Sequence, residues 1–373
     1  MTYLWQLPAW PVLRWDNQAL LEPLGEARYL QGRLFGQLRT LGVEEEQALE
    51  VETIVDEAVT TSAIEGENLP PDAVRSSIAR RLGLDHAGLP TPPRNVDGVV
   101  EMLLDATLNH ALPLTHERLK GWQAALFPTG YSGIRKIVVG DWRGGLEPMQ
   151  VVSGQLGAER VHFVAPPAHR VPAEMDQFLH WWSVDSKDLT GMIRAAVGHL
   201  WFETIHPFED GNGRVGRALV DMALAQEEGR SHRLYSLSSQ ILAEGRAYYQ
   251  AIEAAQSGSG DITSWLTWFL GCVARAIERS EASVQTAVAK GQFWQRAVGH
   301  ELNARQTKLI NRLLDAGPGG FKGGLTNKKY CAMTKASKAT ATRDLTDLLN
   351  RGILVRVGQK RGTRYDLNWE LTR

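Results

Sequence analysis

The spacing of apolar residues along the chain predicts a mainly helical protein. Between about Val43 and Glu65, apolar positions recur every three or four residues, as on one face of a helix. Residues 96–111 and 115–127, and the segments AEMDQFLHWW, AAVGHLWFETI and VGRALVDMALAQEE, are typical of further helices. The most apolar stretch, WLTWFLGCVARAI, contains Arg275 and is shorter than the roughly 20 residues that a membrane span needs. It predicts a buried helix.

Two parts of the chain depart from this helical pattern. Residues 1–30 are rich in Trp, Pro and Leu and lack a clear period, which predicts a loop-rich arm packed by Trp5, Trp10 and Trp15. In residues 130–170, β-branched runs on either side of QLGAE predict a β-hairpin. Long helices around one hairpin indicate a mainly α domain.

The C-terminal part has a different order of elements. After the loop GPGGFKGG come KKYCAMTKAS, then TATRDLTDLLNRG, then ILVRVGQKRGTRYDL. Two helices followed by a short basic hairpin are the order of a winged helix-turn-helix. In that interpretation, the recognition helix runs from Ser337 to Asn350.

Charge separates the same part from the rest. From His300 to Arg373 the chain has 15 Lys and Arg against 6 Asp and Glu, a balance of +9. The remainder has 26 against 36, a balance of −10, so the overall net charge of −1 hides the asymmetry. The excess predicts phosphate contacts from a set of basic residues, namely Lys335, Lys338, Arg343, Arg356, Lys360, Arg361 and Arg364. The alternative is a winged fold that contacts protein or supports a dimer, with its charges merely solvated.

Bulk composition places the chain among ordinary globular proteins. Hydrophobic residues make up 43% and charged residues 22% of it. Two cysteines, Cys272 and Cys331, are too few for a disulfide framework, which favours a reducing compartment. The start, MTYLWQLPAW, lacks the basic region and apolar core of a signal peptide. We therefore expect a cytoplasmic protein without a membrane partner.

The stretch HPFEDGNGRVGR at 206–217 carries the strongest indication of chemistry. Pro207 disfavours a helical conformation at His206, which should therefore end the preceding helix. A Gly-Asn-Gly turn before an apolar helix suits an anion-binding nest at a helix N-terminus. Arg214 and Arg217 share a face of the first helical turn, where a polyanion would offset their charge. Asp210 supplies a hard oxygen that could hold Mg²⁺ against phosphate. These are the groups that position a triphosphate and deprotonate a hydroxyl.

This stretch resembles, at every defined position, the signature HPFx[D/E]GNGRxxR of Fic-domain proteins. The resemblance implies a protein adenylyltransferase, which moves AMP from ATP onto a hydroxyl side chain of a target protein. His206 would be the general base, Asp210 would bind Mg²⁺, and Phe208 would anchor the loop. The implied phosphate contacts come from Gly211, Asn212, Gly213, Arg214 and, at the γ-phosphate, Arg217.

A second stretch, TSAIEG at 61–66, resembles the inhibitory motif [S/T]xxxE[G/N] of Fic proteins, in the class II position before the core. Gly66 is a plausible helix C-cap, so Glu65 would lie in the last helical turn, where the helix dipole disfavours a carboxylate. By itself this residue could be an ordinary surface glutamate. The resemblance implies instead that Glu65 pairs with Arg217 and prevents that arginine from orienting ATP. In some relatives the same glutamate positions water for AMP removal, and the sequence leaves that alternative open.

Two further segments resemble the family less specifically. The strand Val161, His162, Phe163 and Val164 would form the target-docking flap, or belong to an ordinary hairpin. In GRAYYQAIEAAQSG, Tyr248 and Tyr249 would line the adenosine pocket, although such pairs are more often core residues. His199 is expected to be a hydrogen-bonded core histidine rather than a metal ligand.

The predicted fold is therefore a mainly α Fic-type helical domain with a β-hairpin flap, followed by a C-terminal winged helix-turn-helix. The predicted boundaries are an N-terminal arm with the inhibitory helix at 1–90, a catalytic core at 91–290 and the winged helix at 300–373. The alternative function is a DNA-binding regulator that senses nucleotide without transferring it, although pure binding needs no base such as His206. The Trp-rich N-terminus could serve a homodimer, but the sequence pattern does not indicate a dimer interface.

Overall fold

The computed structural model describes residues 2–39, 41–85, 87–153, 160–231, 233–297, 301–317, 321, 324–357 and 363–372. Its contacts divide the chain into two units. The first unit comprises Met1–Gly32 and Glu50–Ser280, and the second comprises Arg33–Leu49 and Glu281–Arg373. Each unit has a core of its own and is described separately.

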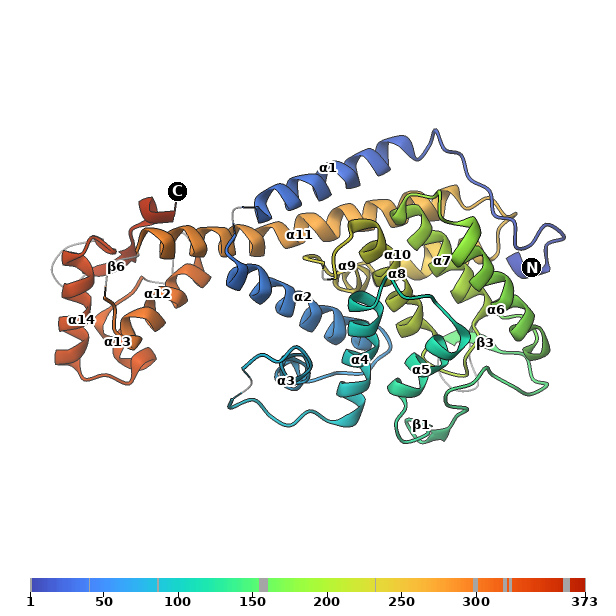
Figure 1. The fold of residues 1–373 in the computed structure, drawn as a ribbon, viewed down its shortest axis with the longest axis horizontal. Helices are drawn as coiled ribbons and strands as arrows, with labels where there is room; N and C mark the ends of the chain where they lie inside the picture. Colours follow the sequence, from blue (N-terminus) through green and yellow to red (C-terminus); the bar gives the residue numbers. More distant parts are fainter. Residues whose placement is uncertain are drawn as a thin grey trace. The chain divides into compact units, whose positions relative to one another are not determined.

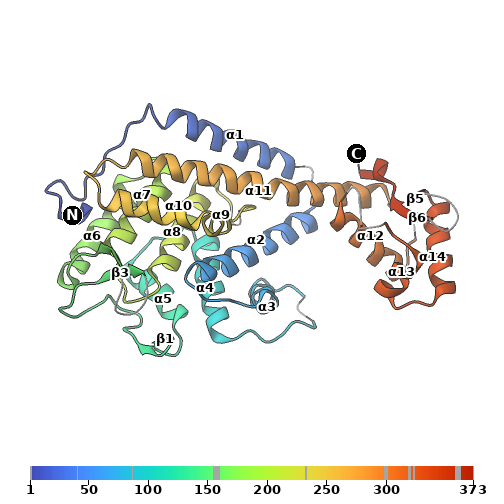
Figure 2. The same ribbon diagram turned by 180° about the vertical axis from the view of Figure 1, so that it is seen from behind.

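The protein is mainly helical, and its elements can be followed in Figures 1 and 2. The helices are α1 (Leu21–Leu38), α2 (Val43–Ile64), α3 (Pro71–Arg81), α4 (Arg94–Leu108), α5 (His116–Leu126), α6 (Val171–His180), α7 (Gly191–Ile205), α8 (Asn212–Glu228), α9 (Leu237–Ala243), α10 (Gly245–Gln256), α11 (Thr263–Arg296), α12 (Ala304–Ala316), α13 (Asn327–Thr334) and α14 (Lys338–Asn350). The strands form three antiparallel pairs: β1 (Tyr131–Ser132) with β2 (Arg135–Lys136), β3 (Gln150–Ser153) with β4 (Arg160–Val164), and β5 (Leu354–Val357) with β6 (Arg364–Leu367).

Helix α7 forms the centre of the first unit. Every residue of it except Arg194 is buried, because the sequence offers apolar or small side chains on all sides. Helix α8 packs along it, α4 and α5 contact α8, and α6 and α10 contact α7 (Figure 1). At Gly98 of α4, a β-carbon would lie 1.8 Å from the carbonyl oxygen of Ala125. Only glycine therefore allows α4 and α5 to approach this closely.

The N-terminal arm is more regular than its composition predicts. The prediction of a loop throughout residues 1–30 is wrong from Leu21 onward, where α1 begins. Pro23 argues against a helix when residues are judged by helix propensity alone. This proline lies in the first turn of α1, however, where no backbone N–H is needed. The indole N–H of Trp5 donates to the carbonyl oxygen of Val164 at 2.7 Å, and that of Trp10 donates to Glu174 at 2.7 Å. These two hydrogen bonds attach the N-terminal arm to strand β4 and helix α6.

The prolines at 70 and 71 begin a helix and do not end one, since α2 has already ended at Ile64. The sequence interpretation stopped helical structure at Asn68-Leu-Pro-Pro, yet α3 starts at once, with Pro70 as its N-cap and Pro71 as its first residue. A proline is well suited to that position because the first helical N–H groups have no partner within the helix. The short pair β1–β2 was also not foreseen. The turn that the sequence interpretation placed at QLGAE, between β3 and β4, lies outside the described residues.

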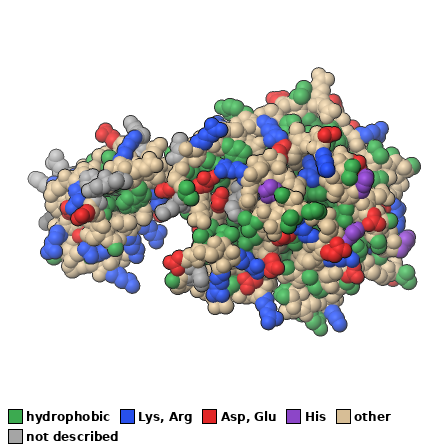
Figure 3. Space-filling model, in the orientation of Figure 1, with side chains coloured by type: hydrophobic (Ala, Val, Ile, Leu, Met, Phe, Trp, Pro, Cys, Tyr) green, Lys and Arg blue, Asp and Glu red, His purple; other side chains and the backbone are tan. Residues whose placement is uncertain are grey.

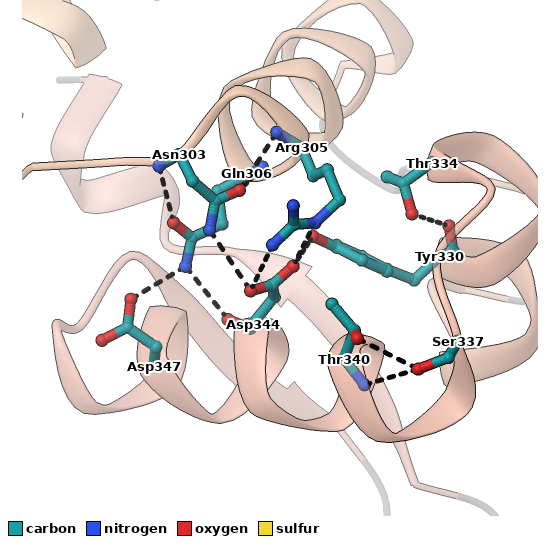
Figure 4. Close-up of polar contacts among 9 residues, drawn as sticks. All are labelled: Asn303, Arg305, Gln306, Tyr330, Thr334, Ser337, Thr340, Asp344 and Asp347. Atoms are coloured by element: carbon teal, nitrogen blue, oxygen red, sulfur yellow. Dashed lines mark hydrogen bonds and ion pairs between the residues drawn. The ribbon is translucent and has the colours of Figure 1, made fainter.

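The second unit includes α12, α13, α14 and the pair β5–β6, together with parts of α1, α2 and α11, and it has a separate core. The sequence predicted α13, α14 and the hairpin in this order, but not α12. That core is built from Leu309, Leu313, Tyr330, Leu345, Ile353 and their neighbours. Asp344 lies inside it and accepts hydrogen bonds from Arg305 at 2.9 Å and from the hydroxyl of Tyr330 at 2.7 Å (Figure 4). One carboxylate thus joins α12, α13 and α14.

Within the described residues, no helix has both the length and the apolar composition to cross a membrane. The stretch 265–277, predicted to be a buried helix, belongs to α11, and its side chains at Trp265, Leu270 and Val273 are buried.

The contacts of Asp344 generate a prediction for stability. Its carboxylate is buried and charge-paired, and removing one member of such a pair leaves the others unsatisfied. We expect Asp344→Ala to lower the free energy of opening of α12–α14 by about 2–4 kcal/mol. Asp347→Ala is the matched control on the same helix, because its carboxylate is 39% exposed, and it should cost about 1 kcal/mol or less. Amide hydrogen exchange of α12–α14 measures both, and equal losses would contradict the prediction.

Candidate active site

The stretch 206–217 forms the connection between α7 and the first turns of α8. Helix α7 ends at Ile205, and His206 adopts a left-handed conformation with φ of 51°. Its backbone N–H still donates to the carbonyl oxygen of Phe202 at 2.9 Å. A non-glycine residue in this conformation costs on the order of 1 kcal/mol and persists only where neighbouring contacts hold it.

Arg143 supplies those contacts. Its guanidinium donates to the carbonyl oxygens of His206 at 2.7 Å and Ile205 at 3.3 Å, and its backbone N–H donates to that of Pro207 at 2.9 Å. Burial lowers the pKa of Arg143 to about 10, but a positive charge is favourable beside the carbonyl end of a helix. Arg143 is not recognisable from the sequence, because nothing in its local pattern distinguishes it from other polar loop residues.

Asn212 fixes the shape of the loop. Its side-chain oxygen accepts the backbone N–H of Phe208 at 2.9 Å, and its side-chain nitrogen donates to the carbonyl oxygen of the same residue at 2.8 Å. Phe208 is fully buried against Trp142, with 4.9 Å between ring centres, in agreement with its expected anchoring role. The amide of Asn212 is thus used inside the loop, so contact with a phosphate would come from its backbone.

The segment after α2 meets the start of α8. Gly66 has φ of 80° and caps the helix, since its N–H donates to the carbonyl oxygen of Ala63 at 3.0 Å. Glu65 is thereby directed at Arg217, and the two side chains lie 2.8 Å apart, as the resemblance implied. Arg217 also donates to the hydroxyl of Thr61 at 2.7 Å and to its carbonyl oxygen at 2.9 Å. Although burial acts to lower it, the Glu65 carboxylate holds the pKa of Arg217 above its ordinary value.

The glycine at 213 makes room for this ion pair. A β-carbon there would lie 2.1 Å from the Glu65 carboxylate oxygen and 3.0 Å from the Arg217 guanidinium. The glycine at 211 has φ of 89° and begins α8 as its N-cap, a conformation that favours glycine. Glycine is thus favoured at each of the two positions for a different reason: a positive φ at 211 and a lack of space at 213.

A second ion pair, which the sequence analysis did not foresee, joins the same two segments. Glu67 accepts a hydrogen bond from Arg214 at 2.9 Å and another from the side-chain amide of Asn95 at 2.7 Å. The Arg214 guanidinium lies over the ring of Phe127, 5.0 Å from its centre. Both arginines of the loop are therefore paired with carboxylates from the segment that follows α2.

A cavity of about 720 Å³ opens beside these pairs. Its lining includes Glu65, Glu67, Asp210 and Arg214, together with backbone and side chains of the 126–133 segment. Asp210 reaches it with a side chain that is 37% exposed, while its carboxylate accepts hydrogen bonds from Ser132 and from the N–H of Gly211.

The donor set fits a magnesium ion only in part. Within the described residues, no group of three or more His, Cys, Asp or Glu is arranged to hold a metal. Mg²⁺ in nucleotide sites usually takes one or two carboxylates and completes its shell with water and phosphate oxygens. The accessible carboxylate of Asp210, at the cavity wall, suits that mode of binding.

The imidazole of His206 lies in an environment that keeps it neutral. Burial, reinforced by the charge of Arg143, lowers its pKa to about 4. Its Nδ1 atom lies 3.7 Å from a carboxylate oxygen of Glu203, one turn earlier on α7. Burial, with the charge of Glu65, raises the pKa of Glu203 to about 8. At neutral pH the pair is therefore an uncharged imidazole beside a protonated carboxyl group.

The two tyrosines that were assigned to an adenosine pocket differ in accessibility. Tyr248 is buried, and its hydroxyl lies 2.8 Å from Nε2 of His199, which is a core histidine as expected. Tyr249 is 49% exposed and stacks edge-on against Tyr248, with 5.1 Å between ring centres. Of the pair, Tyr249 is the one that offers a surface to a ligand.

Strand β4 carries the four residues assigned to the flap. Val161 is 43% exposed, Phe163 is buried, and the His162 ring lies 2.8 Å from the carboxylate of Glu253. The carbonyl oxygen of Val164 accepts the indole N–H of Trp5 at 2.7 Å. Val164, the last residue of the predicted docking strand, thus already accepts a hydrogen bond from within the chain.

Comparison with known proteins agrees with this geometry. Residues 113–224, which include the whole 206–217 stretch, match the Fic/DOC family, and residues 3–84 match a domain of unknown function, DUF4172. A probable protein adenylyltransferase of Aquifex aeolicus is 32% identical over 85 residues, or 23% of this chain. The aligned part spans 26% of the length of that relative.

Solved structures show the same fold. A Fic family protein from Desulfovibrio desulfuricans G20 superposes with a TM-score of 0.56 at 20% identity, covering 95% of this chain and 97% of that one. A Fic domain containing signaling protein from Bacteroides thetaiotaomicron VPI-5482 gives 0.53 at 18% identity, covering 70% and 97%. Residues 113–224 of the chain therefore resemble the Fic/DOC family in sequence, and the chain shares the fold of these two structures.

Proposed function

We propose that the chain is a protein adenylyltransferase of the class II Fic type, which transfers AMP from ATP to a Ser, Thr or Tyr hydroxyl of a target protein. The observation that carries the proposal is the convergence at the start of α8. A neutral imidazole, two arginines and the accessible carboxylate of Asp210 lie on one short connection, and Asp210 and Arg214 of this set also line a cavity of about 720 Å³. The name of the Aquifex aeolicus relative supports the same activity.

The chemistry uses groups already described. The target hydroxyl attacks the α-phosphorus of ATP, its proton passes to His206, and the bond to pyrophosphate breaks. A base must be neutral before it accepts a proton, and the lowered pKa of His206 satisfies that condition. Backbone N–H groups of Gly211, Asn212 and Gly213 and the guanidinium of Arg214 would hold the phosphates. When bound, Mg²⁺ on Asp210 would neutralise phosphate charge.

The same geometry supports autoinhibition. Arg217 is the residue that the Fic signature assigns to the γ-phosphate, and here it is 2% exposed and bonded to Thr61 and Glu65. While this pair persists, the arginine is unavailable to orient a triphosphate. Relief of inhibition requires α2 to release Glu65, or a substitution that removes its carboxylate.

Two alternatives use the same residues. Glu65 faces the loop and could position water for removal of AMP from a modified protein. A nucleotide-sensing regulator would bind ATP without transferring AMP, and in that case His206 would be dispensable. The proposal also includes a target-docking role for strand β4, a contact of Tyr249 with adenosine, and a homodimer.

The first prediction concerns Glu65. Removing its carboxylate takes away the charged partner of Arg217 and leaves the neutral oxygens of Thr61. Hydrogen bonds between charged groups are worth about 1.5–3 kcal/mol, so Glu65→Gly should raise AMP transfer about 10- to 100-fold. Adding His206→Ala should then reduce transfer by about 10²- to 10⁴-fold, the usual contribution of a general base. Labelled ATP with Mg²⁺ measures both. Equal labelling by the wild type and Glu65→Gly would refute the inhibition, and labelling without His206 would refute the base.

The second prediction concerns Glu67. Glu67→Ala should free Arg214 and tighten ATP binding by about tenfold, while AMP transfer rises little because Arg217 is still held. Calorimetric titration with ATP checks this, and the double variant with Glu65→Gly should exceed either single variant in transfer. Glu101→Ala is the control, since Glu101 pairs with Arg81 at 3.0 Å, outside the loop. Unchanged ATP affinity in Glu67→Ala would show that this pair does not restrain Arg214.

The third prediction follows from the raised pKa of Glu203. Unfolded chain releases this proton near pH 4.5, whereas the folded protein keeps it until about pH 8. Stability should therefore fall as pH rises from 4.5 to 8, by about 1.4 kcal/mol per unit of pKa difference. Glu203→Gln has no proton to lose at this position. Its free energy of unfolding in urea, relative to that of the wild type, should therefore rise across that window. Glu253→Gln is the control, because the hydrogen bond with His162 lowers the pKa of Glu253, so its contribution to stability changes below pH 4.5 and not across that window. Parallel profiles for the wild type and Glu203→Gln would contradict the prediction.

A further inference from the structure

Helices α13 and α14 of the second unit are joined by a short, well-defined turn. Helix α13 ends at Thr334 and α14 begins at Lys338, and Lys335 takes a left-handed conformation with φ of 54°. Ser337 caps α14 by accepting the N–H of Thr340 at 3.2 Å (Figure 4). Two packed helices joined by three residues have the geometry of a helix-turn-helix, whose second helix enters the major groove of DNA.

The two faces of α14 differ in chemistry. Ala341, Leu345 and Leu348 are buried in the core of the second unit. The exposed residues form what we call the basic face of α14, namely Lys338, Ala339, Thr342, Arg343, Thr346 and Asn350. None of these six is a large apolar residue, whereas protein interfaces are usually built around aromatic or aliphatic side chains. The composition favours a polar, negatively charged partner.

The acidic residues of α14 point away from its basic face. Asp344 is buried against Arg305 and Tyr330, and Asp347 accepts a hydrogen bond from Gln306 at 2.8 Å (Figure 4). Asp347 also accepts a hydrogen bond from Arg351 at 2.9 Å. Helix α14 has no other carboxylate, and all its residues are described. Within the described chain, neither Lys338 nor Arg343 forms an ion pair. Their charges are therefore available to a phosphate backbone.

The hairpin β5–β6 adds charge of the same sign. Arg356 and Arg364 are exposed on its two strands, where Arg356 pairs with Tyr365 and Arg364 pairs with Val357. Lys360 and Arg361, the other basic residues expected on the hairpin, lie outside the described residues. Figure 3 shows Lys and Arg side chains gathered over the part of the second unit that carries α13 and α14.

We propose that the second unit binds duplex DNA, with α14 in the major groove. Lys335 and Lys338, at the turn and the start of the helix, contact phosphates, as do Arg356 and Arg364 of the hairpin. Arg343, flanked by Thr342 and Thr346, faces the base edges, where a guanidinium pairs with guanine and a threonine methyl contacts thymine. This site is separate from the proposed AMP transfer and does not depend on it.

The test measures binding of the full chain to a fluorescent random-sequence duplex of about 20 base pairs at about 50 mM salt and at rising salt concentrations. We expect binding that weakens with salt, and a double variant Lys338→Ala/Arg343→Ala that loses about tenfold or more in affinity with a salt slope smaller by about one to two. Lys308→Ala/Arg312→Ala is the matched control, because it removes one exposed lysine and one exposed arginine from α12. It should bind as the wild type does.

Three results would overturn the proposal. They are absence of duplex binding at low salt, equal weakening by the two double variants, and equally tight binding of single-stranded DNA, which has no groove for a helix. Circular dichroism of both variants checks that each remains folded. Arg343→Lys keeps the charge but not the forked guanidinium, so it should keep the salt dependence while lowering sequence preference in a selection from random duplexes.

Discussion

The candidate site depends on how the fold accommodates one buried positive charge. Arg217 lies on a helix that is buried along most of its length, at the end where the helix dipole is already positive. A guanidinium in that place is unfavourable unless anionic or carbonyl oxygens surround it. The end of α2 provides them, from the Glu65 carboxylate and from both oxygens of Thr61. The position of α2 against α8 follows from this requirement, and so does the competition between its carboxylate and any phosphate.

Burial has the opposite effect on the neighbouring imidazole. His206 cannot easily hold a proton, because its ring is largely shielded from solvent and Arg143 lies on its backbone side. The carboxyl group of Glu203 is made neutral by the same exclusion of water. One low-dielectric environment therefore keeps the histidine uncharged and prevents the adjacent glutamate from acting as a permanent counter-ion. The cation that must remain charged, Arg217, is the one that receives direct oxygen partners.

Residues close together in sequence were predicted well, and residues that meet only in the fold were not. The 206–217 stretch specifies its own loop through proline, two glycines and Asn212, so its local conformation is legible in the sequence. The pairing of Glu65 with Arg217 was reached only through a family motif, since 152 residues separate them. Arg143, Glu67 and Glu203 were missed because each acts through a partner that periodicity cannot place. Helix α1 and helix α3 were missed because prolines in a first turn resemble helix breakers.

The glycine at position 213 belongs to the turn proposed to bind phosphate, and a β-carbon there would also enter the space that the Glu65 carboxylate occupies. A larger side chain there would expel the carboxylate, yet it would also intrude where phosphate oxygens approach the backbone. A mutation in the turn would therefore displace Glu65 and disturb the proposed phosphate contacts at the same time. A mutation at the end of α2 would remove the Glu65 carboxylate and leave the turn intact. Constitutively active forms of such a protein should therefore arise, in evolution or in selection experiments, through changes in the N-terminal helix and not in the signature itself.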